Sequence, residues 1–251
     1  MQIDLSTRKI FITGAGKGIG LAMAQHLAHA GAHVWAHYRS NSPELNDLGS
    51  AFQTVHLVQG DLADPADATR IFQEVCVQAG NLTGVVWNAG VFLGHPVKDT
   101  SEEWMRVWHQ TMAINLHAVG QLTHVALQHF LAHGGGQMIF VASRAAFRGE
   151  TAEYLAYAAS KGALVSLGKS VARSFGKNGV TSFILAPGFT RTQMAEAFIQ
   201  EVGEAQVLAE IGLNELTTPE DMAPLVTLIL SGAMNHASGT TIDFNAASYM
   251  H

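Results

Sequence analysis

The sequence predicts a doubly wound α/β fold, in which helices cover both faces of one parallel sheet of about seven strands. Short apolar runs alternate with segments of helical periodicity along the 251 residues, and the joins between them are short. A glycine-rich turn separates the first strand from the first helix. No linker, internal repeat or low-complexity stretch divides the chain, so residues 1–251 are expected to form a single domain.

The first expected strand, at residues 10–12, runs into the glycine-rich turn. The turn reads Thr13-Gly14-Ala15-Gly16-Lys17-Gly18-Ile19-Gly20, and a helix with apolar Ile19, Met23 and Leu27 follows. Such a turn at a helix N-terminus lets the backbone approach a pyrophosphate, which free N–H groups and the helix dipole stabilise. Glycines can also serve only a tight turn. The strand before and the helix after favour the phosphate site.

The second strand, at residues 32–37, ends without a carboxylate. The chain continues His37-Tyr38-Arg39-Ser40-Asn41, and its next acidic residue is Glu44. In a dinucleotide-binding fold an acidic residue here binds the ribose 2′-hydroxyl, whereas an arginine accommodates a 2′-phosphate. Arg39 offers the planar donors that suit phosphate, and Lys17 adds a second cation. Both can also be ordinary surface cations. The pattern favours NADP(H) over NAD(H).

The other strands are expected at residues 54–59, 84–87, 137–142, 181–186 and 240–244. Asp61, after the third strand, can contact the adenine end of a cofactor or cap the next helix. Asp64 stands directly before Pro65 and is the better cap, which leaves Asp61 freer for a ligand. Asn88-Ala89-Gly90 ends the fourth strand with small residues, as the ligand crevice of such sheets requires.

Helices are expected from Asp64-Pro65 to Ala79, from Thr100 or Ser101 to about His133, from about Tyr154 to Gly176, and from Pro219. Asn115 lies in the middle of the second, where asparagine is a mediocre helix former and could simply face solvent. Residues 190–218 are mixed and loosely helical, which is typical of a flexible substrate lid.

Tyr157 and Lys161 are four residues apart on one helix, so that their side chains share a face. A free tyrosine has a pKa near ~10, and a fixed ammonium nearby is expected to lower it toward the range of general acid–base catalysis. Taken alone, such a pair is usually a packing residue and a solvated one. Whether the pair is catalytic therefore depends on the other motifs of the chain.

Composition and other motifs exclude several classes of function. The net charge of −6 gives no reason to expect nucleic acid or membrane partners. Cys76 is the only cysteine, no apolar run reaches the ~18 residues of a membrane span, and the N-terminus is no signal peptide, which indicates a cytoplasmic protein. His26, His29, His33 and His37 cannot share one helical face, so no metal site is expected.

Together these motifs make the chain resemble a short-chain dehydrogenase/reductase of the common single-domain type with a Rossmann fold. The resemblance extends from Ile10 to about Asn245 and rests on motifs in the family's order. These are Thr13-Gly14-(three residues)-Gly18-Ile19-Gly20, Asp61, Asn88-Ala89-Gly90, Asn115, Ser143, Tyr157-(three residues)-Lys161 and Pro187-Gly188. It implies an NADP(H)-dependent enzyme that interconverts a small carbonyl compound and a secondary alcohol.

The resemblance assigns catalytic roles to Asn115, Ser143, Tyr157 and Lys161. Tyr157 would be the general acid or base, Lys161 would lower its pKa and bind the nicotinamide ribose, Ser143 would hold the substrate oxygen, and Asn115 would position a water. It implies cofactor contacts for Gly14, Lys17, Gly18, Ile19, Gly20, Arg39, Ser40, Asp61, Leu62, Asn88, Ala89, Gly90, Tyr157, Lys161, Pro187, Gly188, Thr190 and Thr192.

The family resemblance also implies a homotetramer, or a homodimer, built on the helices around Asn115 and Tyr157. An apolar substrate pocket is suggested by Phe147 and by five residues of the expected lid, Met194, Phe198, Ile199, Val207 and Leu208. Asn245-Ala246-Ala247 lacks the family's usual pair of glycines. Two alternatives are a non-catalytic NADP-binding sensor or scaffold and a reductase of enoyl C=C bonds.

Overall fold

The computed structural model describes residues 3–192, 195–196, 199–200 and 203–251. Its seven parallel strands form one sheet in the order β3-β2-β1-β4-β5-β6-β7. The strands are β1 (Lys9–Ile12), β2 (His33–Tyr38), β3 (Val55–Gln59), β4 (Gly84–Trp87), β5 (Gly136–Val141), β6 (Val180–Pro187) and β7 (Thr241–Phe244). Each predicted strand is present, and the predicted fold class is confirmed.

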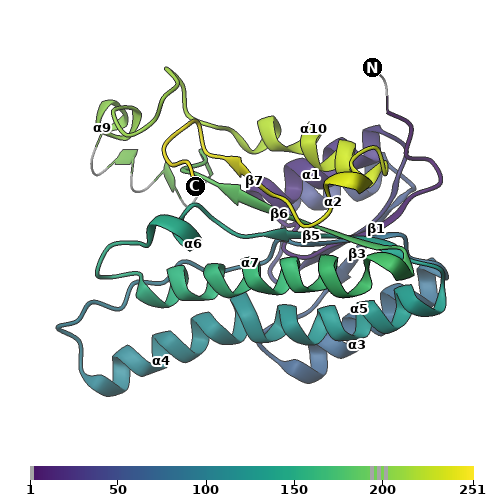
Figure 1. Ribbon diagram of the computed structural model, residues 1–251, viewed down its shortest axis with the longest axis horizontal. Helices are drawn as coiled ribbons and strands as arrows, with labels where there is room; N and C mark the ends of the chain where they lie inside the picture. Colours follow the sequence, from purple (N-terminus) through teal and green to yellow (C-terminus); the bar gives the residue numbers. More distant parts are fainter. Residues whose placement is uncertain (1–2, 193–194, 197–198, 201–202) are drawn as a thin grey trace.

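Helices cover both faces of the sheet (Figure 1). On one face lie α1 (Gly18–His29), α2 (Pro43–Ala51) and α10 (Pro219–Leu230). On the other lie α3 (Pro65–Ala79), α4 (Ser101–Met112), α5 (Ala118–Ala132) and α7 (Leu155–Phe175). Two short helices, α6 (Ala145–Arg148) and α9 (Glu204–Leu208), lie beyond one edge of the sheet. No helix of the described ranges is long and apolar enough to cross a membrane.

The alternation of side chains along the central strands divides the core between the two faces. Phe11 and Trp87 point to the α3–α5–α7 face, where their rings meet edge to face at 6.0 Å. Ile10 and Ile12 belong to the opposite cluster with residues of α1 and α10. All four are essentially inaccessible to solvent. Burial on both faces explains why these strands read as unbroken apolar runs.

Side-chain caps define where several helices begin. Asp64 accepts a hydrogen bond from Ala66 N at 2.8 Å and caps α3, as predicted. Thr100 caps α4, through Glu103 N at 3.2 Å. Ser42 caps α2, a helix that the sequence analysis did not predict. The signal for α2 was the Ser42-Pro43 pair, a cap residue followed by a proline at the first helical position.

The long helix expected between residues 100 and 133 is interrupted in its middle. The turn η1 (Ala113–His117) has π-helical hydrogen bonding and joins α4 to α5. A π-turn widens the helix by one residue and often marks a functional site. Here it contains Asn115, which is fully buried rather than solvent-facing.

The segment after β7 holds two alanines in a backbone conformation that favours glycine. Ala246 has φ +51° and Ala247 has φ +56°, at the positions where the family's glycine pair was found to be missing. An L-residue with a Cβ is strained in this region. Ala246 O nevertheless accepts a hydrogen bond from Gly212 N at 2.7 Å, which ties the segment to the chain after α9.

We expect the double substitution Ala246→Gly and Ala247→Gly to raise the free energy of unfolding by roughly 1 kcal/mol, because it removes this backbone strain. The measurement is equilibrium unfolding in urea. Ala66→Gly, in the exposed first turn of α3, is the control and should lower stability by roughly 0.5–1 kcal/mol. A double variant less stable than the parent protein would contradict the account.

Candidate active site

The candidate site lies where the strands end, at the carboxyl edge of the sheet. Because all strands are parallel, the segments after β1, β4, β5 and β6 meet at this edge. The strand order reverses between β1 and β4, which is where open α/β sheets bind their ligands. The segments carry the glycine turn, Asn88, Ser143 and Pro187-Gly188.

Asn88 and Thr13 fasten the glycine turn to the end of β4. Asn88 Nδ2 donates to the carbonyl oxygens of Thr13 and Gly14, each at 3.0 Å. Thr13 Oγ1 in turn accepts from the backbone N–H groups of Asn88 and Ala89, at 3.0 and 3.1 Å. Asn88 therefore shapes the turn, and Ala89 lies directly beneath it.

The buried imidazole of His37 supports the same turn from β2. Its Nδ1 accepts from Gly14 N at 3.1 Å, and its Nε2 lies 3.1 Å from Gly60 O, which makes Nε2 the protonated nitrogen. Burial lowers the pKa of His37, against smaller opposing effects of the Gly60 carbonyl and of Asp67 and Asp61. The sequence analysis assigns His37 no role in the site. The signal for its role was its place at the end of the strand beside the turn.

The glycine turn fits the pyrophosphate of a dinucleotide. Gly14 has φ +68°, and a Cβ there would approach Ala89 Cα to 2.8 Å; a Cβ on Gly20 would approach Gly14 O to 2.2 Å. Side chains are thus excluded and the backbone is left bare. Helix α1 begins at Gly18 without a side-chain cap. Its first N–H groups and its dipole are oriented toward the turn, as phosphate binding requires.

The residues predicted to contact the adenosine half surround the ends of β2 and β3. Lys17, Arg39 and Ser40 are exposed there, and neither cation forms an ion pair within the described residues. Asp61 Oδ1 accepts from Ala63 N at 2.9 Å, so part of its carboxylate serves its own loop. Leu62 is buried, with 6% of its surface exposed.

Asn115 joins three segments through its side chain. Its Oδ1 accepts from Val91 N at 2.8 Å, and its Nδ2 donates to Val91 O at 3.0 Å and to Ser160 Oγ at 3.1 Å. The π-turn, the segment after β4 and helix α7 are thereby held together. Gly90 lies against this site, since a Cβ there would be 3.3 Å from Asn115 Oδ1 and 3.4 Å from Lys161 Nζ.

Helix α7 brings Tyr157 and Lys161 to the site on one face. Lys161 is 4% exposed; its Nζ donates to Val141 O, at the end of β5, at 2.8 Å, and lies 5.7 Å from the centre of the Tyr157 ring. Ser143 follows β5, and its hydroxyl acts on the Tyr157 phenol and lowers the pKa of that group. The structure therefore brings together Asn115, Ser143, Tyr157 and Lys161, as the sequence indicated.

The prediction that Lys161 lowers the pKa of Tyr157 is wrong for this structure. Burial raises the pKa of Tyr157; the Ser143 hydrogen bond lowers it, and the negative charge of Glu150 raises it further. Lys161 is not among these causes. Burial also lowers the pKa of Lys161 to about 8, and its ammonium is directed at the Val141 carbonyl. Removal of both groups from water outweighs their spacing on the helix.

The segment after β6 borders both the glycine turn and the site. Gly188 N donates to Phe244 O at 3.0 Å, and Thr190 Oγ1 donates to Gly188 O at 3.3 Å. A Cβ on Gly18 would approach Thr192 Cγ2 to 3.3 Å, so Thr192 lies directly beside the glycine turn. Of the four residues predicted to contact the cofactor here, Pro187, Gly188, Thr190 and Thr192, the structure brings Thr192 against the glycine turn.

The expected apolar pocket is only partly seen. Phe92, not singled out from the sequence, stacks on Tyr154 at 3.8 Å and meets the Tyr157 ring edge to face at 4.7 Å. A separate small hydrophobic cluster contains Ile199, Val207 and Leu208 together with Ala195 and Leu216. Part of the apolar surface of the first three is therefore buried in this cluster and not available to a substrate pocket. Met194 and Phe198 lie outside the described residues. Phe147 stacks on His251 at 3.9 Å.

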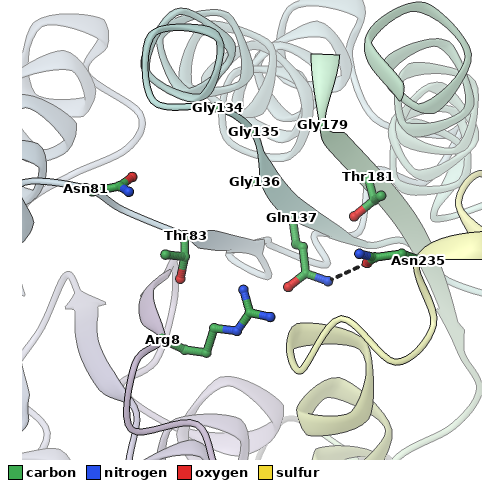
Figure 2. Close-up of a pocket in the computed structure, with 10 residues that line it drawn as sticks. All are labelled: Arg8, Asn81, Thr83, Gly134, Gly135, Gly136, Gln137, Gly179, Thr181 and Asn235. Atoms are coloured by element: carbon green, nitrogen blue, oxygen red, sulfur yellow. Dashed lines mark hydrogen bonds between the residues drawn. The ribbon is translucent and has the colours of Figure 1, made fainter. Parts of the chain in front are cut away.

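A polar cavity of about 220 Å³ lies at the opposite edge of the sheet (Figure 2). It is lined by Arg8, Asn81, Thr83, Gly134, Gly135, Gly136, Gln137, Gly179, Thr181 and Asn235. Among these residues only Arg8 is ionisable, and its Nη2 donates to Ser231 O at 2.7 Å. The cavity has no acid–base pair. Within the described ranges no three His, Cys, Asp or Glu side chains converge as metal ligands.

Comparison with known proteins identifies the family. The family model described as short chain dehydrogenase matches residues 8–203. The 3-oxoacyl-[acyl-carrier-protein] reductase FabG of Staphylococcus aureus is 27% identical over 97% of this chain and 99% of the relative, and that of Escherichia coli K12 is 27% identical over 95% and 96%. A crystal structure of a proposed NAD(P)-dependent gluconate 5-dehydrogenase from Beutenbergia cavernae, with NADP bound at low occupancy, superimposes with a TM-score of 0.90 at 30% identity over 99% of both chains.

His37 predicts a dependence of stability on pH. Its lowered pKa means that the folded protein resists protonation there, whereas the unfolded chain takes up the proton near pH 6.5. The free energy of unfolding should therefore fall as the pH is lowered from about 6.5 toward the folded pKa.

The measurement is urea unfolding between pH 7.5 and 5 for the parent protein and for His37→Asn, whose amide oxygen still accepts from Gly14 N. The difference between the two curves isolates His37 from the other twelve of the thirteen histidines. We expect a shallower decline in the variant. Parallel curves would contradict the assigned role.

Proposed function

Because this chain belongs to the short chain dehydrogenase family, we propose that it is an NADP(H)-dependent oxidoreductase that interconverts a carbonyl compound and a secondary alcohol. The observation that carries the proposal is the convergence of Asn115, Ser143, Tyr157 and Lys161 beside the glycine turn. A non-catalytic sensor on the same fold has no need of these four side chains together.

In this mechanism the bound nicotinamide supplies or accepts the hydride. Tyr157 transfers the proton at its phenol oxygen, to the carbonyl oxygen in reduction and from the hydroxyl in oxidation. Its raised pKa keeps the phenol protonated at neutral pH, which suits a proton donor. The Ser143 hydroxyl, which acts on the same phenol, holds the same substrate oxygen. Ser143 and Tyr157 together orient the carbonyl.

Lys161 and Asn115 maintain this arrangement. Lys161 is held under the site by Val141 O, and its pKa of about 8 lets it carry a charge at neutral pH. In this proposal that charge stabilises the negative charge left on the Tyr157 oxygen once the proton has been transferred. Asn115 fixes the segment after β4 against α7, and in this proposal its π-turn leaves room for a water that connects Lys161 to solvent.

The preference for NADP(H) rests on Arg39 and Lys17. Both side chains are exposed at the ends of the segments that would bind the adenosine ribose. Within the described residues, neither of them forms an ion pair with a carboxylate. A free guanidinium suits a 2′-phosphate, and no acidic residue follows β2 before Glu44 to bind a 2′-hydroxyl.

The relatives support carbonyl chemistry over the alternatives. The FabG proteins are reductases of 3-oxoacyl groups, and the Beutenbergia cavernae protein is assigned to the oxidation of an alcohol group of gluconate. Both reactions interconvert a ketone and a secondary alcohol. Neither name describes the reduction of a C=C bond, and in this proposal Ser143 holds the oxygen of the substrate.

Other features of the enzyme follow from the same proposal. The chain would act as a single domain, with residues 190–218 as the variable lid over a small-molecule substrate. We propose a cytoplasmic homotetramer, or a homodimer, that packs through the outer faces of α4, α5 and α7. The exposed Met105 and Leu131 on these helices support this packing.

Tyr157→Phe should lower kcat by roughly 10²–10⁴-fold, because it removes the proton that general acid catalysis supplies. The Kd for NADPH should stay within about threefold, since the aromatic ring remains. Tyr154→Phe is the matched control and should keep near-parental turnover, because no cation lies four residues further along the helix. Rates come from NADPH oxidation with a carbonyl panel. Full activity of Tyr157→Phe would refute the mechanism.

Arg39→Asp should weaken NADPH binding by roughly 10–100-fold, because the 2′-phosphate loses a charge-assisted contact and gains a repulsive one. NADH binding should be unchanged or tighter. Arg173→Asp, exposed near the far end of α7, makes the same change in net charge and controls for long-range effects. Fluorescence titration measures both cofactors. Unchanged NADPH affinity in Arg39→Asp would assign the phosphate to another residue.

A further inference from the structure

Arg144, directly after Ser143, carries a buried positive charge whose ion pair in the described chain, with Glu210, is long. Only 9% of its side chain is exposed, and its Nη1 has no hydrogen-bond partner. The nearest carboxylate is that of Glu210, with Oε2 3.9 Å from Nη2, beyond hydrogen-bonding distance. Glu210 itself is 62% exposed, so that water screens its charge.

The neighbouring charges do not change this imbalance. Arg148, one helical turn away, pairs with Glu150 at 3.6 Å and adds positive charge beside Arg144. Burial, and then the charge of Arg148, lower the pKa of Arg144, whereas Glu150 and Glu210 raise it. Buried guanidinium groups in proteins are usually paired and hydrogen-bonded, because an uncompensated charge is costly. A buried donor of this kind is suited to an anion from outside the chain.

The backbone fixes Arg144 at the reacting end of the site. Arg144 N donates to Pro187 O at 2.9 Å, which joins the end of β5 to the segment that would border the nicotinamide. Ser143, one residue earlier, acts on the Tyr157 phenol and lowers its pKa. The carboxylate of Glu150, which pairs with Arg148, raises the pKa of both Tyr157 and Arg144.

We infer that Arg144 binds a carboxylate of the substrate, so that the enzyme acts on keto acids and the corresponding hydroxy acids. The inference rests on the proposed carbonyl–alcohol chemistry. The guanidinium presents its N–H donors in a plane that matches the two oxygens of a carboxylate. Ser143 and Tyr157 hold the reacting oxygen, and Arg144 holds the acid group of the same molecule. Glu210 faces Arg144 weakly and yields to the incoming anion.

The test compares keto acids with their methyl esters, which keep the carbonyl and lose the charge. The panel contains 2-, 3-, 4- and 5-keto acids, and kcat/KM is measured with NADPH for the parent protein, Arg144→Met and Arg148→Met. We expect the parent to prefer acids, and Arg144→Met to lose roughly 10–100-fold on acids alone. Arg148→Met, the matched control, should retain most of the preference.

A direct binding measurement separates this inference from the proposed function. Binding of the same acids to the NADP⁺-saturated protein is measured by calorimetry for the parent and Arg144→Met. Turnover that does not prefer acids, or a preference that survives in Arg144→Met, overturns the inference and leaves the proposed function intact. Arg144-dependent binding of acids without any turnover supports the inference and overturns the proposed function. If the protein shows no turnover and no Arg144-dependent binding of acids, both the inference and the proposed function are overturned.

Glu210→Gln provides a second test that does not alter a buried residue. Removal of the competing carboxylate should raise kcat/KM for acids by a few-fold and leave the esters unchanged. Glu215→Gln, an exposed carboxylate of the same segment, is its control. An equal effect of Glu210→Gln on acids and esters would contradict a carboxylate site at Arg144, even if Arg144→Met failed to fold.

Discussion

The parallel direction of all seven strands is the constraint on which the site depends. It brings the ends of β1, β4, β5 and β6 to one edge, so residues far apart in the sequence become neighbours there. Asn88 donates two hydrogen bonds to Thr13 across this edge, and Val141 O accepts a hydrogen bond from the ammonium of Lys161. Loss of the register of one central strand would displace both halves of the site, because each half takes its anchor from a strand end.

Two buried cations at this edge differ in how they are satisfied. Lys161 donates to a backbone carbonyl at 2.8 Å, and its pKa falls to about 8. Arg144 cannot give up its proton at neutral pH, and its Nη1 has no partner. We propose that the Lys161 ammonium stabilises the proton-transfer residue Tyr157, and that the Arg144 guanidinium binds a negative charge on the substrate. The contrast explains how one small region can recognise both ends of a keto acid.

Much of this architecture could be predicted from the sequence, because short apolar runs and helix caps are local signals. The strands, the Asp64 cap and the meeting of Ser143 with Tyr157 are examples. The π-turn at Asn115 could not be predicted, since it depends on hydrogen bonds to Val91 and Ser160. The support of the glycine turn by His37 could not be predicted either, because it depends on tertiary contacts with Gly14 and Gly60.

The pKa values and the charge environment of the site were the features least predictable from the sequence. The spacing of Tyr157 and Lys161 indicated a lowered tyrosine pKa, yet burial raises it in the structure, because the fold encloses Lys161 fully and Tyr157 in part. Burial is a property of the whole fold, and no local pattern reports it. The burial of Arg144 and its Nη1 without a hydrogen-bond partner could not be predicted for the same reason, because an arginine after a serine carries no signal of its environment.

The central claim is the transfer of hydride between a nicotinamide and a carbonyl carbon. The most direct test supplies NADPH with deuterium at the transferable position together with keto acids and enoyl thioesters, and locates the label by mass spectrometry. We predict one deuterium on the carbinol carbon of a hydroxy acid for each NADPH consumed. Deuterium on a saturated carbon chain would indicate enoyl reduction, and binding of NADPH without any transfer would indicate a sensor. Either result would contradict the account.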